Sequence, residues 1–189
     1  MGRTALLVVD MLNAYDHVDS DALAGSVEET VPTIADLIAR AEEGDVPVVY
    51  VNDNFGNWSD GRDEIVERVL AGRRPDLVEP IVPHADFPFV VKARHSAFYE
   101  TPLEYLLRQS GVTRVVVTGQ VAEQCIFYSA LDAYIRHFEV VVPRDGVAHI
   151  HQHLADAALE MMQTNMRAEV VTADACLGQA VSAGTRSGR

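Results

Sequence analysis

The sequence of 189 residues has few cysteines and no long apolar run. Its two cysteines, Cys125 and Cys176, lie far apart, which does not suggest a disulfide framework. No apolar stretch approaches the length needed to cross a membrane, and the run near the first residue is too short for a signal-peptide core. We therefore expect free thiols, a place in the reducing cytoplasm and no membrane partner.

Positive charge is also scarce, because 15 Lys and Arg stand against 28 Asp and Glu, for a net charge of −13. Without a cluster of basic residues, the chain is not expected to bind nucleic acid or an anionic membrane surface. No internal repeat or linker divides it, and 48% hydrophobic residues are ordinary for a globular protein. We expect a single domain over residues 1–189, with a poorly ordered tail from about residue 179.

Short apolar runs alternate with helical patterns along the chain. Strands are expected at 5–9, 46–51, 87–91, 115–117, 138–142 and 169–172, and helices at 27–41, 62–71, 101–111, from about 125, and 153–166. Residues 11–26 are expected to form a loop. Ser26 with Glu29, and Thr101 with Glu104, predict capping boxes at two helix starts. This alternation predicts a three-layer α/β/α sandwich around a six-stranded, mainly parallel Rossmann-like sheet.

Three reactive side chains, those of Asp10, Lys92 and Cys125, each follow a different predicted strand. In parallel sheets the carboxyl ends of the strands share one edge, so the three side chains could meet in one pocket. Cys125 is expected in the first turn of a helix, where free N–H groups and the helix dipole would lower the pKa of its thiol. That stretch alone fits a buried structural cysteine equally well. Asp10 and Lys92 favour the interpretation of Cys125 as a nucleophile. A charge at a buried strand end is costly unless it is paired, so the two side chains are expected to form an ion pair close to the thiol.

This combination of groups suits attack on an amide-type carbonyl. Asp10 can take the proton of Cys125, and Lys92 can orient the carboxylate and offset developing negative charge. Backbone N–H groups of the turn before the helix, including that of Cys125, are placed to form an oxyanion hole. Another interpretation is a binding or assembly protein on the same fold whose three residues are idle.

The segments ALLVVDMLNAYD, YVNDNFGNW, VVKARHSAFYETPLEYLL and VVVTGQVAEQC resemble, in order and spacing, the isochorismatase-like cysteine hydrolases. This family includes nicotinamidases and N-carbamoylsarcosine amidohydrolases. The resemblance implies a catalytic triad of Asp10, Lys92 and Cys125. It also implies a cis peptide bond between Gln120 and Val121, which would place the backbone N–H of Val121 in the oxyanion hole. A small amide or ureido substrate and a homo-oligomer, a dimer or tetramer, follow from the same resemblance.

Departures from the family pattern bear on metal and substrate. Nicotinamidases carry an Asp-x-His pair after the second strand, where this chain has Asp53-Asn54-Phe55, so we expect no catalytic metal and no other cofactor. The resemblance also implies an alternative, an isochorismatase-type ether hydrolase that uses Asp10 without the thiol. Catalytic isochorismatases lack the cysteine, so Cys125 argues against ether hydrolysis. Side chains that could line a substrate pocket are Asn13, Tyr15, Phe55, Trp58, Tyr99 and Glu123. His95 and Ser96 are expected to shape a loop, and Cys176 to be structural.

Overall fold

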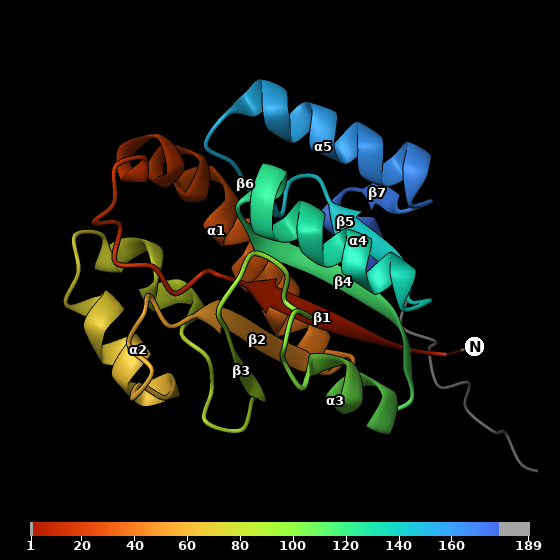
Figure 1. Ribbon diagram of the computed structural model, residues 1–189, viewed down its shortest axis with the longest axis horizontal. Coiled ribbons are helices and arrows are strands. Elements are labelled where there is room, and N and C mark those ends of the chain that lie inside the picture. Colours follow the sequence, from red (N-terminus) through yellow and green to blue (C-terminus); the bar gives the residue numbers. More distant parts are fainter. Residues whose placement is uncertain (1, 178–189) are drawn as a thin grey trace, which may run out of the picture.

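A parallel sheet runs through the centre of the molecule, with helices on both of its faces (Figure 1). The structure is a computed structural model that describes residues 2–177, so the predicted disordered tail lies outside the described residues. Its strands are β1 (Arg3–Val9), β2 (Val48–Asp53), β3 (Phe89–Lys92), β4 (Val112–Gln120), β5 (Glu139–Pro143), β6 (Val147–Ala148) and β7 (Glu169–Val171). The order is β3-β2-β1-β4-β5-β7, with β6 beside β4, and the pairings are parallel.

The predicted α/β/α architecture is confirmed, but the sheet has seven strands rather than six. The strand that sequence analysis missed is β6, which pairs through Val147 and Ala148 with Gly119 and Gln120 of β4. Two residues are too few to show a periodic pattern, so this strand exists only because β4 offers it a partner. No helix within residues 2–177 has the length and apolar character that a membrane span requires.

Different helices cover the two faces of the sheet. The helices are α1 (Ser20–Glu43), α2 (Arg62–Leu70), α3 (Leu103–Gln109), α4 (Phe127–Ile135), α5 (Gln152–Asn165) and α6 (Ala173–Cys176), with short turns η1 (Pro75–Leu77), η2 (Glu79–Ile81) and η3 (Ala122–Ile126). In Figure 1, α4 and α5 lie in front of the sheet and α1 behind it. The side chains of β1 alternate between the two resulting cores: Leu7 packs on the side of α3, α4 and α5, and Leu6 on the side of α1. Burial on both faces explains why β1 reads as a continuous apolar run.

The prediction of a loop as far as residue 26 is wrong, because α1 begins at Ser20. Leu23 and Ala24 are buried against the core, and this packing outweighs the Asp- and Gly-rich composition of the segment. The predicted capping box is therefore also wrong. Ser26 lies inside the helix, where its Oγ accepts a hydrogen bond from the backbone N–H of His149 at 3.0 Å and lies 2.9 Å from the Nδ1 atom of the same residue.

The second predicted capping box also needs correction. Helix α3 starts at Leu103, and its N-cap residue is Pro102 rather than Thr101. The Oγ1 of Thr101 donates to the carbonyl of Ala97 and accepts a hydrogen bond from the backbone N–H of Leu103 at 3.4 Å. In α5, Met162 is buried and Met161 is about half exposed. The remaining predicted helices and strands are present, with ends that shift by a few residues.

The chain reverses its direction across the sheet between β1 and β4, which are neighbours there. From β1 it moves outward through β2 and β3, and it then returns to the other side of β1. Gly119 makes the close approach of the two strand ends possible: its φ is 121°, and a Cβ atom there would lie 2.1 Å from the carbonyl oxygen of Val9. Such reversal points, at the carboxyl ends of the strands, are where α/β sheets bind ligands.

Candidate active site

Asp10, Lys92 and Cys125 meet at the carboxyl edge of the sheet. Asp10 directly follows β1, Lys92 ends β3, and Cys125 lies in the turn η3 that follows β4. The Nζ atom of Lys92 lies 2.7 Å from Oδ2 of Asp10 and 3.7 Å from Sγ of Cys125. All three residues line one cavity of about 390 Å³. The structure thus brings together the three side chains that sequence analysis singled out.

Asp10 is held in place from three directions. Its backbone adopts the left-handed conformation with φ 55°, which turns the chain sharply at the end of β1. Its Oδ1 accepts a hydrogen bond from the backbone N–H of Asp53 at 2.9 Å, while Oδ2 faces Lys92. Its carbonyl oxygen accepts a bond from the side-chain amide of Gln120 at 2.6 Å. Both carboxylate oxygens therefore have partners, and the orientation of the group is defined.

Lys92 is the single lysine of the sequence, and its side chain is 1% exposed. An ammonium group has three N–H bonds to donate. Here Nζ has three acceptors within reach: the carboxylate of Asp10, the carbonyl oxygen of Arg94 at 2.9 Å and the sulfur of Cys125. A buried charge of this kind is tolerated because it is paired and hydrogen-bonded.

The pKa of the Cys125 thiol is raised, whereas the sequence predicted that it would be lowered. Burial raises the pKa of Cys125 above its ordinary value, and the charge of Asp10 raises it further, while Lys92 and a backbone hydrogen bond from Val121 act in the opposite direction. The predicted lowering of this pKa is wrong, because desolvation and a neighbouring carboxylate outweigh the N–H groups of the turn. The resting sulfur therefore carries its proton.

The two charged partners have raised pKa values as well. Burial raises the pKa of the Asp10 carboxyl, although Lys92 opposes this effect. For Lys92, burial disfavours the ammonium, but the charge of Asp10, and that of Cys125 once its thiol ionises, raise its pKa overall. A carboxylate with a raised pKa is a better proton acceptor, and a lysine with a raised pKa stays cationic. Asp10 is thus suited to take the proton that Cys125 retains.

The turn before Cys125 contains a cis peptide bond between Gln120 and Val121, at the position that the family resemblance implied. Gln120 is buried and connects this turn to the rest of the site: it donates to the carbonyl of Asp10 and accepts from the hydroxyl of Tyr15 at 3.4 Å. The turn η3 is π-helical rather than α-helical, a form that occurs frequently at functional sites. Val121 and Cys125 both line the cavity.

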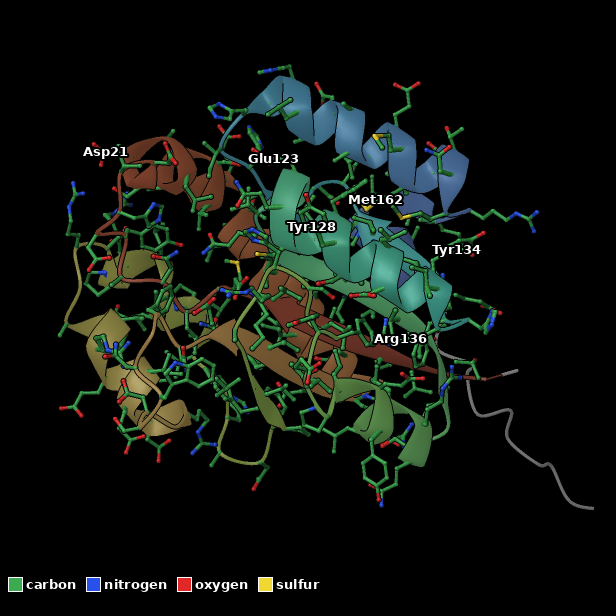
Figure 2. The ribbon with its side chains drawn as sticks, viewed as in Figure 1. Asp21, Glu123, Tyr128, Tyr134, Arg136 and Met162 are labelled. Atoms are coloured by element: carbon green, nitrogen blue, oxygen red, sulfur yellow. The ribbon has the colours of Figure 1, made fainter. Side chains whose placement is uncertain are left out.

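Of the six predicted pocket residues, Asn13 and Phe55 line the cavity and the other four do not. Tyr15 is 1% exposed and lies beneath it, bonded to Gln120. Trp58 is 72% exposed at the surface, and Tyr99 lines a separate surface hollow between the segment after β3 and α4. Glu123 has a structural contact, because its Oε1 accepts hydrogen bonds from the backbone N–H groups of Ile150 and His151. In Figure 2 it lies between the start of α4 and the segment that leads to α5.

Several residues outside the six pocket candidates also line the cavity. They are His17, Asp19, Leu23, Arg94, Gln124 and Ile150, together with His95, which the sequence assigned only to loop structure. The Nδ1 atom of His95 lies 3.7 Å from Sγ of Cys125, so this residue contacts the candidate nucleophile. One signal could have identified it, since Arg94 and His95 directly follow the strand end at Lys92.

Within residues 2–177, no group of three or more His, Cys, Asp or Glu side chains is arranged as a metal site. Asp53, the first residue of the segment Asp53-Asn54-Phe55, has other contacts here. Its backbone N–H donates to Asp10, and its Oδ1 accepts from the backbone N–H of Phe55 at 2.7 Å. In this chain Asp53 supports the orientation of Asp10.

Comparison with known proteins gives consistent results. Residues 4–175 match the family model described as the isochorismatase domain. An uncharacterized isochorismatase family protein of Bacillus subtilis, YaaI, is 35% identical over 169 residues, which cover 89% of this chain and 93% of that protein. The ureidoacrylate amidohydrolase RutB of Methylorubrum extorquens is 30% identical, with coverage of 85% and 76%. The crystal structure of N-carbamoylsarcosine amidase from Thermoplasma acidophilum has a TM-score of 0.70 at 28% identity, covering 93% of this chain and 99% of its own.

Proposed function

This chain belongs to the isochorismatase family, and we propose that it is a metal-independent cysteine hydrolase that cleaves a C–N amide-type bond of a small molecule. The family includes amidohydrolases, as the names of two relatives state. The observation that carries the proposal is the position of the Cys125 thiol, which shares a cavity with a buried pair of Asp10 and Lys92. Nucleophile, base and orienting cation are the groups that such a reaction requires.

In the first half of the proposed reaction, Asp10 takes the proton of the Cys125 thiol, and the thiolate attacks the substrate carbonyl. Lys92, 3.7 Å from the sulfur, offsets the negative charge as it moves from carboxylate to sulfur and then to the substrate oxygen. The backbone N–H groups of Val121 and Cys125 are the proposed donors to that oxygen. The amine leaves with the proton that Asp10 had accepted, and a thioester remains.

In the second half, water hydrolyses the thioester. Asp10, again a carboxylate, accepts a proton from the water as it attacks, and the proton then passes to the departing sulfur. The product is a carboxylic acid, or a carbamic acid when the substrate is a ureido compound. A cavity of about 390 Å³ matches a small substrate rather than a polymer.

The test is to measure ammonia release from a panel of small amides by the native protein and by Cys125→Ala. The panel is ureidoacrylate, maleamate, N-carbamoylsarcosine and nicotinamide. We expect turnover of at least one compound, loss of about a thousand-fold or more with Cys125→Ala, and a thioester adduct on Cys125 by mass spectrometry. Cys176→Ala is the matched control, because this second thiol is fully buried and donates to the carbonyl of Ala173.

Other outcomes separate the alternatives. Hydrolysis of an ether that survives Cys125→Ala but not Asp10→Asn would establish ether chemistry instead. A non-catalytic binding protein would turn over no compound in the panel, and iodoacetamide would label Cys125 no faster than Cys176. Either result would reject the proposed amidase chemistry.

Two further features remain proposals. We propose that the protein is a homo-oligomer, either a dimer or a tetramer, which sedimentation analysis would measure directly. We also propose the cytoplasm as its place of action, in keeping with two thiols that are free in the structure.

A further inference from the structure

His95 contacts the sulfur of Cys125 from a different position than the two charged partners. Its Nδ1 atom lies 3.7 Å from Sγ, the same separation as that between Sγ and Nζ of Lys92. The side chains of Lys92 and Asp10 are only 1% and 12% exposed, whereas His95 is an exposed residue that lines the mouth of the cavity. The sulfur thus lies between a buried ion pair and an imidazole that reaches solvent.

The segment that carries His95 is fixed on both sides of the imidazole. Before it, the carbonyl oxygen of Arg94 accepts a bond from Lys92 at 2.9 Å. After it, the backbone N–H of Ala97 donates to the Oγ of Ser129 in α4 at 2.9 Å. The ring itself stacks on Tyr128, with the centroids 5.5 Å apart and the planes at 22°. Figure 2 shows Tyr128 on α4, the helix that continues from the turn of Cys125. The position of Nδ1 beside the sulfur is therefore set by the fold.

Several charged and titratable groups share the two hollows that His95 lines. From its own segment and β3 these are Lys92, Arg94 and Tyr99; from α4 they are Tyr128 and Asp132; from the turn and β1 they are Cys125 and Asp10. The segment before α1 adds His17 and Asp19, and the end of β2 adds Asp53. Of these groups in the described part of the chain, Cys125 is the one within hydrogen-bonding distance of the imidazole.

We propose that His95 is a second proton acceptor for the Cys125 thiol. The S–H bond breaks, its electron pair stays on sulfur, and the proton forms a bond to Nδ1, which gives an imidazolium beside a thiolate. The proton then passes to the nitrogen of the leaving amine, which restores the neutral imidazole. Because His95 is exposed and Asp10 is nearly buried, His95 also exchanges protons with water between turnovers. This inference deepens the proposed function and rests on Cys125 as its nucleophile.

A second proton acceptor is useful because Asp10, a nearly buried carboxylate, is otherwise the one base that can take the proton of Cys125. Desolvation and the carboxylate of Asp10 hold the proton on the thiol, and Asp10 is itself engaged with Lys92 and with the backbone N–H of Asp53. Histidine is the side chain whose charge ordinarily changes between about pH 5 and 8, so it can accept this proton near neutral pH. A cysteine paired with a histidine is a recurrent way to form a reactive thiolate.

The experiment measures the rate at which iodoacetamide alkylates Cys125 from pH 5 to 10, by mass spectrometry of the peptide that contains it. For the native protein we expect a rise in rate between about pH 5 and 8, followed by a second rise at alkaline pH. His95→Asn keeps a polar atom near the position of Nδ1 but does not titrate. It should lose the first rise, react about ten-fold more slowly at pH 7 and keep the alkaline rise.

Two further variants separate proton transfer from packing. His95→Phe preserves an aromatic ring against Tyr128 and should behave as His95→Asn does. His84→Asn is the matched control, because His84 is also an exposed histidine stacked on an aromatic ring, that of Phe87 at 5.1 Å, and it should leave the profile unchanged. The proposal is overturned if His95→Asn retains the native profile, or if the rate falls equally at every pH. It is also overturned if His95→Phe retains the first rise.

Alkylation needs no substrate, so this test is independent of the proposed function. A histidine-dependent profile without turnover of any amide would reject the amidase and leave the thiol–imidazole pair. Amide turnover with a profile that His95→Asn does not change would reject the role of His95 and leave the amidase.

Discussion

The ammonium of Lys92 lies 2.7 Å from the carboxylate of Asp10, and both side chains are almost removed from water. Asp10 follows β1 and Lys92 ends β3, with β2 between these strands in the sheet. Each charge offsets the desolvation of the other, so neither is stable in this position alone. The stability of the fold and the protonation of the candidate site are therefore linked through one pair of residues.

Lys92→Met should lower the free energy of unfolding by about 3–5 kcal/mol at neutral pH, because it leaves the carboxylate of Asp10 buried without its partner. Urea unfolding measures this change. The double variant Asp10→Asn with Lys92→Met should regain part of the loss, since no charge then remains unpaired. Arg3→Gln is the control: it breaks an ion pair with Asp45 that is largely in solvent and should change stability by less than about 1 kcal/mol. Equal effects from the buried and the exposed variants would contradict the prediction.

Stability should fall as the pH rises above about 8.5, the ordinary pKa of a cysteine. The pKa of Cys125 is raised in the folded state, so the folded protein keeps a proton that the unfolded chain releases. The free energy of unfolding then decreases with pH, by up to about 1.4 kcal/mol per unit. Lys92, whose pKa is also raised, acts in the same direction above about pH 10. Cys125→Ser, which does not ionise in this range, should show a shallower decline in urea unfolding between pH 8.5 and 10. Parallel curves for the two proteins would refute this assignment.

Gly119→Ala should prevent correct folding or cost more than about 4 kcal/mol. The new Cβ would lie 2.1 Å from the carbonyl oxygen of Val9, and the φ of 121° is strained for any other residue. Gly25→Ala is the matched control, because Gly25 lies inside α1 with open space around its Cβ position. This second change should stabilise the protein by about 0.5–1 kcal/mol. Thermal unfolding of both variants measures the contrast, and a mild effect at Gly119 would mean that β1 and β4 can separate.

Glu123→Ala should reduce stability by about 1–3 kcal/mol, because the carboxylate accepts the backbone N–H groups of Ile150 and His151. The variant should also loosen the segment before α5, which hydrogen exchange at these two amides would detect. Glu29→Ala, at an exposed position of α1, is the control and should change stability by less than about 0.5 kcal/mol. Unchanged protection of both amides would contradict this role for Glu123.

Sequence patterns predicted most of the architecture because a strand buried on both faces must be continuously apolar. The continuous apolar residues of β1 and the consecutive valines of β4 indicate strands buried on both faces, which is typical of a parallel sheet. Asp10, Lys92 and Cys125 lie at or just past the ends of such apolar runs, so the sequence alone identifies them as candidates. The sheet topology predicts that these three side chains lie close together, since the carboxyl ends of parallel strands share an edge.

Local signals failed where packing decided the outcome. The start of α1 was missed because Leu23 is buried by residues distant in the sequence. The sequence offers both Tyr15 and Trp58 as pocket candidates, yet one lies beneath the cavity and the other at the surface. The exposure of a side chain depends on how helices and strands pack against each other, and the sequence of one segment does not contain this information.

The sequence by itself determined the residue types of the candidate site and the strands that carry them. Only the tertiary structure decided the charge state of Cys125 and the approach of His95 to its sulfur. The helix start favoured a thiolate, but desolvation and the charge of Asp10 are larger effects, and both arise from contacts between strands far apart in the chain. A pKa and a contact across a cavity depend on distances in space, and the sequence does not contain those distances.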